Sequence, residues 1–159
     1  MEVLDAFIEV FGSNRVGVKI TPIGRFNDMF DSQPFELYKY FLKEINDRKI
    51  SFVELTRMDH RPVPNFYEIK GEEQIQDVYE TFRPFYNGVL IGNCNFPLEE
   101  AEEFICKNKF EMISFGRLFI ANPDLVSRYK NNLSLNIADP KTFYTPGPEG
   151  YIDYQCYKF

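Results

Sequence analysis

The apolar residues of this chain follow two different periods, which alternate along the sequence. Four short runs are rich in Val, Ile, Leu or Phe and are bounded by Gly, Asn, Pro or charged residues; they cover 15–20 (RVGVKI), 50–55 (ISFVEL), 88–92 (GVLIG) and 112–116 (MISFG). Short runs that are too apolar for burial on one face only are typical of strands inside a parallel sheet.

Longer segments repeat their apolar residues every three or four positions, which predicts amphipathic helices. They cover 2–11 (EVLDAFIEVF), 34–49 (PFELYKYFLKEINDRK), 72–86 (EEQIQDVYETFRPFY), 97–108 (PLEEAEEFICKN) and 122–132 (NPDLVSRYKNN). Three of them have Pro near their start, where its missing N–H costs nothing. Gly12 follows the first segment, at the position of a C-terminal cap.

Strands that alternate with helices predict a parallel α/β sheet covered by helices. The order is one helix and then four strand–helix repeats, which are too few to close an eight-stranded barrel. We expect a single domain over residues 1–159, with a long loop at 56–70 and an irregular tail at 132–159 that is rich in Pro, Gly and Tyr.

Composition and charge narrow the classes of function. The chain has 159 residues, 44% of them apolar, which suffices for one substantial core. A net charge of −6 argues against a nucleic-acid partner, and no apolar run approaches the roughly 20 residues of a membrane helix. Three widely spaced cysteines fit reduced thiols and a cytoplasmic location, and no His/Cys set has metal-ligand spacing.

Two stretches place a glycine where an apolar run ends and a helical pattern begins. They are GNCNFPLEEAEEFI from Gly92 and SFGRLFIANPDL around Gly116 and Arg117. Ligands of parallel α/β proteins bind beyond the carboxyl ends of the strands, where glycine lets backbone N–H groups approach phosphate oxygens. Arg117 could add a bidentate pair. The alternative is that both glycines only allow turns and that Arg117 forms a surface ion pair.

Longer stretches of the chain point to a family. RVGVKITPIGRFNDMFDS, GVLIGNCNF, SFGRLFIANPDLVSRY and TFYTPGPEGYIDYQ follow one another as in the Old Yellow Enzyme family, which includes the oxophytodienoate reductases. The chain resembles the carboxyl-terminal half of that family. The resemblance therefore implies half of a TIM (β/α)8 barrel with about four parallel strands, FMN as cofactor, NAD(P)H as hydride donor and α,β-unsaturated carbonyl compounds as substrates.

Carried over by position, the resemblance assigns the FMN phosphate to Gly92, Asn93, Gly116 and Arg117. Lys19 stands where the family commonly has an Arg beside the flavin pyrimidine, and it keeps that positive charge without the planar fork. The alternative for Lys19 is an ion pair at a strand end. Two further positions match aromatic residues of the family: Phe143, near the flavin, and Tyr144, at the substrate opening. As plain tail aromatics, both would be packing residues.

The family's carbonyl-binding pair and proton-donating Tyr are expected on strands that precede this segment, so no catalytic residue is assigned. His60, in a polar loop, is expected to face solvent, and the acidic run EEAEE is expected to be a solvated helix face. The sequence thus predicts the FMN-binding half of an ene-reductase, inactive without the amino-terminal half. The alternatives are a non-catalytic structural or nucleotide-binding subunit, and an unrelated phosphate-binding α/β domain.

The same resemblance has a consequence for assembly. Half a barrel leaves strand edges unpaired and apolar side chains exposed, a surface that needs a partner. We therefore expect a homo-oligomer, or a complex with a complementary amino-terminal half.

Overall fold

The computed structural model describes residues 1–24, 31–57, 75 and 77–158. These residues form two compact units, Met1–Ser114 and Phe115–Phe159. The expectation of a single domain over residues 1–159 stays a prediction.

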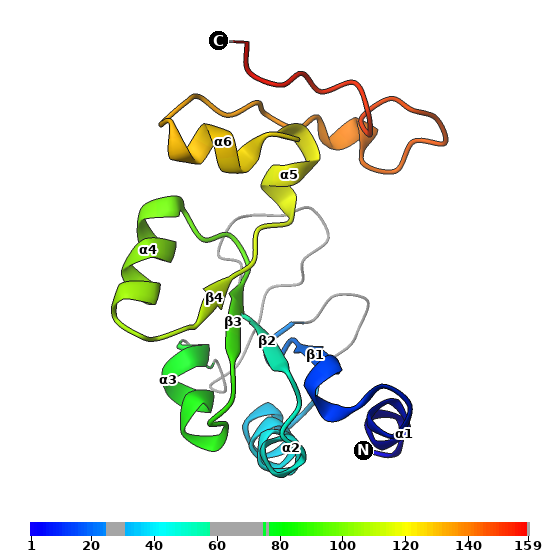
Figure 1. Cartoon of the computed structure of the whole chain (residues 1–159), viewed down its shortest axis with the longest axis vertical. Coiled ribbons are helices and arrows are strands. Elements are labelled where there is room, and N and C mark those ends of the chain that lie inside the picture. The colour runs from blue at the N-terminus through cyan, green and yellow to red at the C-terminus, as the bar shows by residue number, and fades with distance from the viewer. Residues whose placement is uncertain (25–30, 58–74, 76, 159) are drawn as a thin grey trace. The chain divides into compact units, whose positions relative to one another are not determined.

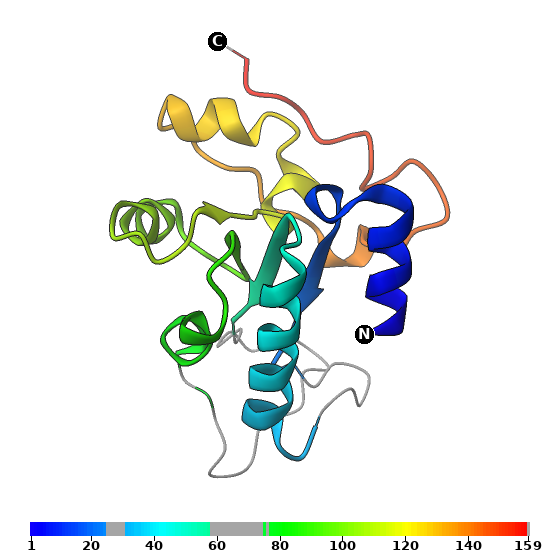
Figure 2. The same cartoon turned by 60° about the horizontal axis from the view of Figure 1, so that its bottom comes forward.

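The first unit is an α/β sheet with its helices (Figures 1 and 2). Its elements are α1 (Glu2–Phe11), η1 (Ser13–Arg15), β1 (Gly17–Ile20), α2 (Pro34–Arg48), β2 (Phe52–Thr56), α3 (Val78–Phe82), η3 (Arg83–Phe85), β3 (Leu90–Asn93), α4 (Leu98–Cys106) and β4 (Met112–Ile113). All neighbouring strands are parallel, in the order β1-β2-β3-β4. The predicted α/β class and parallel sheet are confirmed.

Local chemistry accounts for where the helices begin and end. α1 ends before Gly12, which is the predicted C-terminal cap and has a φ of 81°. α2 begins at Pro34 and ends where Lys49 adopts a left-handed φ of 50°. α3 ends before the predicted end of the helix 72–86, because Pro84 lies within the 3-10 turn η3 that follows it. Most of the first part of that predicted helix, 72–76, lies outside the described residues. Most of the predicted loop 56–70, including His60, lies outside the described residues.

One face of the sheet forms the core. Val53, Leu55 and Leu90 are almost fully buried, and they alternate with residues that are only partly buried. The prediction that these apolar strands are buried on both faces is therefore wrong for the strands in the described residues. The buried face packs with apolar side chains of the helices and connections; these include Leu42, Ile45, Val78, Phe82 and Tyr86. Figure 2 shows α2 running along the strands. The polar side chains of the strands thus lie on the other face and at the strand ends.

The second unit consists of α5 (Arg117–Ala121), α6 (Leu125–Lys130), η4 (Pro140–Thr142) and the turns around them. α5 begins directly after Gly116, where a helical pattern was expected to start, and α6 is shorter than the predicted helix 122–132. The helix begins late because the fully buried Asn122 bonds outside it: its Nδ2 donates to Leu118 O, and its Oδ1 accepts the backbone N–H of Asn136. The side chain of Asn122 thereby stabilises the tail.

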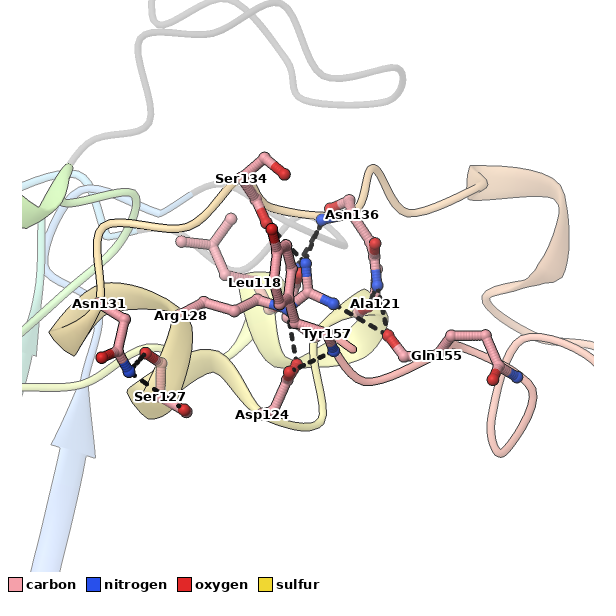
Figure 3. Close-up of polar contacts among 11 residues, drawn as sticks. Leu118, Ala121, Asp124, Ser127, Arg128, Asn131, Ser134, Asn136, Gln155 and Tyr157 are labelled. Atoms are coloured by element: carbon pink, nitrogen blue, oxygen red, sulfur yellow. Dashed lines mark hydrogen bonds and ion pairs between the residues drawn. The ribbon is translucent and has the colours of Figure 1, made fainter. Parts of the chain in front are cut away.

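Arg128 links the tail to α6 (Figure 3). Its side chain, 3% exposed, donates to the Asp124 carboxylate at 2.6 Å, to Ser134 O at 2.6 Å and to Gln155 O at 2.9 Å. The second oxygen of Asp124 accepts the backbone N–H of Tyr157 at 2.7 Å. One buried guanidinium therefore ties both ends of the tail to the helix. Among the described residues, no helix has the length and apolar character to span a membrane.

Candidate functional site

A ring of polar side chains crosses the partly buried face of the sheet, one from each strand or its end. Lys19 Nζ on β1 donates to Glu54 Oε1 on β2 and to Asn93 Oδ1 at the end of β3, each at 3.0 Å. Asn93 Nδ2 donates to Ser114 Oγ at 2.7 Å, and Ser114 Oγ donates to Glu54 Oε1 at 2.8 Å. The four side chains thereby close a hydrogen-bonded ring.

Strand register explains the ring. Lys19 lies directly opposite Glu54, and Thr56 lies directly opposite Asn93, so the cation and the amide come from neighbouring positions. The Lys19 side chain is 51% exposed and the Glu54 side chain 20%, so the ammonium remains accessible while the carboxylate lies deeper. The ion pair that was the alternative for Lys19 does exist. It does not exclude a binding role, because the ring also fixes the orientation of the Lys19 ammonium and the Asn93 amide.

The two glycines differ in what requires them. A Cβ at Gly92 would lie 2.6 Å from Ile113 Cδ1 and 2.9 Å from Phe110 Cδ2, so the buried Gly92 lets neighbouring side chains pack. A Cβ at Gly116 would meet no described atom within 4 Å, and its φ of −104° suits any residue. Local packing therefore accounts for Gly92 and leaves Gly116 without a packing reason.

The connection from β3 to α4 has an unusual backbone. Cys94 has φ 89° and Asn95 has φ 52°, a left-handed pair without glycine. Arg57, the residue after β2, donates to both carbonyl oxygens: Nε to Cys94 O at 2.9 Å and Nη2 to Asn95 O at 3.0 Å. It also binds both carboxylate oxygens of Glu100, at 2.6 and 2.7 Å. Sequence reasoning missed Arg57.

Glu100 corrects one expectation. The EEAEE run was expected to face water, and Glu99, Glu102 and Glu103 are exposed as expected. Glu100 is instead only about one-third exposed, with its side chain 32% accessible, and it is bound bidentately by Arg57. The hydrogen bonds from Arg57 hold the pKa of the Glu100 carboxyl below its usual value, and desolvation opposes them only in part.

The remaining predicted residues belong to the second unit. Arg117 is the first residue of α5 and is exposed. Phe143 is half-buried after η4, and its carbonyl accepts the hydroxyl of Tyr151 at 3.0 Å. Tyr144 is 93% exposed. The roles of all seven predicted site residues, and the joining of both glycine loops around one phosphate, stay predictions.

No group of His, Cys, Asp or Glu side chains within the described parts of the chain could hold a metal ion. The polar groups at the strand ends are instead a lysine, an amide and glycine-containing backbone, and an arginine follows Gly116. These are donors suited to an anion. The fold defines an α/β protein of the parallel-sheet class, and donors of this kind are the ones that bind phosphate groups in other proteins of that class.

Comparison with known proteins gives the family. The sequence profile of the NADH:flavin oxidoreductase / NADH oxidase family matches residues 1–136, so the chain belongs to this family, whose flavin is FMN. It is 38% identical over 153 residues to a probable flavin mononucleotide-dependent alkene reductase of Leishmania infantum, covering 96% of this chain and 39% of that protein. It is 34% identical to 12-oxophytodienoate reductase 1 of rice (Oryza sativa subsp. japonica), covering 97% and 40%.

Solved structures agree. The old yellow enzyme from Trypanosoma cruzi superposes with a TM-score of 0.85 at 35% identity, over 99% of this chain and 39% of that one. Morphinone reductase gives 0.83 at 32% identity, over 98% and 40%. The family, the FMN cofactor and the parallel α/β part of its barrel are thereby confirmed. The chain spans about two-fifths of the length of the curated relatives it matches.

Proposed function

We propose that this chain is the FMN-phosphate-binding part of an Old Yellow Enzyme-like reductase, which transfers hydride from NAD(P)H to the C=C bond of an α,β-unsaturated carbonyl compound. The carrying observation is the match of residues 1–136 to a flavin oxidoreductase family. Gly92, Asn93, Gly116 and Arg117 are in addition residue types that bind phosphate at the ends of parallel strands. Morphinone reductase, a neighbour, has been solved with tetrahydroNAD. That structure supports a nicotinamide partner for this chain.

The donor set fits the phosphate of FMN. Gly92, Asn93 and Gly116 would offer backbone N–H groups to it, and Arg117 would neutralise its charge with a bidentate pair. The open space around the Gly116 Cβ position is consistent with a close backbone approach. When bound, FMN supplies the hydride chemistry of the family.

The chain's own residues would bind and orient the flavin. Lys19, fixed by Glu54 and Asn93, would place positive charge beside the pyrimidine ring. Because the Glu54 carboxylate compensates part of that charge, it weakens the electric field that the Lys19 ammonium exerts on the flavin. Phe143 would pack near the flavin, and the exposed Tyr144 would line the substrate opening. We also propose a reducing, cytoplasmic location, which the exposed thiols Cys106 and Cys156 support.

Thermal protection by FMN or by inorganic phosphate tests the anion site. We expect both ligands to raise the melting temperature of the purified chain, and Arg117→Ala to remove most of that rise. Lys130→Ala is the matched control, because Lys130 is an exposed cation of the same unit and its loss removes the same charge. Equal ligand shifts in the wild type and in Arg117→Ala would show that the site is misassigned.

The two glycines provide a second test. Gly92→Ala should destabilise the fold by about 1–3 kcal/mol, because its Cβ would overlap Ile113 and Phe110. Gly116→Ala should leave stability nearly unchanged, because its Cβ has space, and should still weaken phosphate protection. Full phosphate protection in Gly116→Ala would remove Gly116 from the site.

A non-catalytic nucleotide-binding subunit is the second candidate function. Complementation distinguishes the two candidates. The chain should bind FMN in either case, and only the reductase function predicts enone turnover once the rest of a family barrel is supplied.

A further inference from the structure

Arg57 lies next to the loop to which we assign part of the phosphate site, and an arginine there would ordinarily be taken for a phosphate ligand. Its contacts argue otherwise. Glu100 binds both ends of the guanidinium fork, at 2.6 and 2.7 Å, so the charge of Arg57 is already neutralised. Its Nε and Nη2 also donate to carbonyl oxygens, at 2.9 and 3.0 Å. The guanidinium is therefore committed to the protein.

The groups that Arg57 binds are consecutive. Its backbone N–H donates to Asn93 O at 3.1 Å, and its side chain donates to Cys94 O and Asn95 O. Its guanidinium carbon also lies 3.7 Å from the centre of the Phe96 ring, in stacking range. A single residue thus contacts every position of the chain from 93 to 96.

These bonds set the direction of three peptide groups. In a trans planar peptide the N–H points opposite to the C=O. Since the carbonyl oxygens of residues 93, 94 and 95 all face Arg57, the N–H groups of Cys94, Asn95 and Phe96 are directed away from it. Successive N–H groups on one side of an irregular turn are the kind of donor that binds phosphate oxygens.

The backbone of this turn needs such support. Positive φ angles at Cys94 and Asn95 cost free energy for side-chain-bearing residues, most of all for the cysteine. A strained conformation persists only where its surroundings fix it, and strained residues cluster at binding sites. The two carbonyl oxygens that Arg57 binds belong to the two left-handed residues themselves.

We propose that Arg57 is a positioning residue of the FMN site: through Glu100 and the carbonyl groups of residues 93–95 it holds the β3–α4 loop in its phosphate-binding form, and it does not contact the phosphate itself. The inference rests on the proposed function. It names the group that orients the loop following Gly92.

The test measures affinity for FMN and for inorganic phosphate, below the melting temperature of each variant. Arg57→Lys keeps the charge and loses the fork, so it should weaken both affinities by about tenfold, because a smaller fraction of the molecules holds the loop in its binding form. Arg83→Lys is the matched control. Arg83 has the same kind of bonds, to Gly88 O at 3.0 Å and to Glu111 at 3.2 Å, but Gly88 lies just before β3 and Glu111 directly precedes β4, at the opposite ends of the strands from the loop.

Glu100→Gln separates a positioning role from a ligand role by the sign of its effect. If Arg57 positions the loop, loss of the bidentate carboxylate loosens it and weakens FMN binding. If Arg57 binds phosphate, loss of the carboxylate releases its charge and tightens FMN binding. Tighter binding in Glu100→Gln overturns the proposal. The Glu100→Gln variant also keeps the proposal testable if Arg57→Lys does not fold.

Two further outcomes are decisive. If Arg57→Lys lowers the melting temperature as Arg83→Lys does and leaves both affinities at the wild-type value, Arg57 is structural only and the proposal is overturned. In that case the dependence of binding on Arg117 still stands. If the wild-type chain binds neither FMN nor phosphate, the proposed function fails, and this inference fails with it.

Discussion

Replacement of Arg128 by Met should release the carboxyl-terminal tail. Met retains much of the volume of the buried side chain and removes every hydrogen bond that the guanidinium makes. The tail would then lose its bonds at Ser134 and at Gln155, the two points where Arg128 fastens it to α6. The change concerns function, because the tail between these points contains Phe143 and Tyr144.

The size of the effect follows from the buried contacts. A hydrogen bond to a charged group contributes about 1.5–3 kcal/mol, and Arg128 makes two of them to tail carbonyl oxygens. We expect a loss of about 3–5 kcal/mol for the attachment of the tail, the range found when one partner of a buried ion pair is removed. A loss of that size multiplies local opening at least about a hundredfold.

Amide hydrogen exchange measures this opening. The N–H groups of Asn136 and Tyr157 are suitable probes, because the first donates to Asn122 Oδ1 and the second to Asp124 Oδ2, each at 2.7 Å. Lys130→Met is the control, since it removes an exposed cation from the same helix. If both amides exchange at the same rate in Arg128→Met as in Lys130→Met, the tail is held by other contacts and the reasoning is wrong.

Three further predictions concern pH, catalysis and assembly. The pKa of Glu100 is lowered in the folded chain, so the ionised carboxylate stabilises the fold above its ordinary pKa of about 4.3, and this contribution is lost as pH falls through the lowered pKa. The difference in the free energy of unfolding between wild type and Glu100→Gln, measured by denaturation, should therefore depend on pH only in that acidic window. The purified chain alone should reduce cyclohexenone negligibly in an NAD(P)H assay, because the resemblance places the carbonyl-binding pair and the proton donor on earlier strands; measurable turnover would refute this. Val3, Phe7 and Phe11 on α1 are 72%, 52% and 54% exposed, an apolar surface that needs a partner. Light scattering should therefore report a dimer or a larger complex. A monodisperse, cooperatively unfolding monomer would contradict the half-barrel argument.

The strands and most helices could be predicted from the sequence because their signals are local. Gly12 and Pro34 mark the end of α1 and the beginning of α2, and the structure has both helices close to the predicted bounds. The sequence signal was weaker where a helix depends on a distant partner. Asn122 lies inside a helical pattern and is drawn out of it by Asn136, so α6 begins later than predicted.

The polar contacts of the candidate site could not be predicted, because they depend on register between strands. Lys19 meets Glu54 only because β1 and β2 pair at those positions, and Arg57 reaches Cys94 only because Thr56 lies opposite Asn93. A correct register, set by aligning Leu55 with Gly92, would have placed Arg57 beside the loop that follows Gly92. The family resemblance assigned Gly92 and Gly116 without knowledge of the strand register, because a resemblance carries over sequence positions and not the contacts between side chains.

The strand order also bears on how the sheet is built during synthesis. Each strand pairs with the one that precedes it in the sequence, so β2 has its partner as soon as it is made, and the same holds for β3 and β4. A nascent chain that leaves the ribosome could therefore extend the sheet one strand–helix unit at a time. Parallel pairing is slow, because a crossover must close before any strand contact forms. Because every crossover in this sheet joins strands that are consecutive in the sequence, each pairing step is short. The time during which an unpaired strand edge is open to another chain is therefore limited.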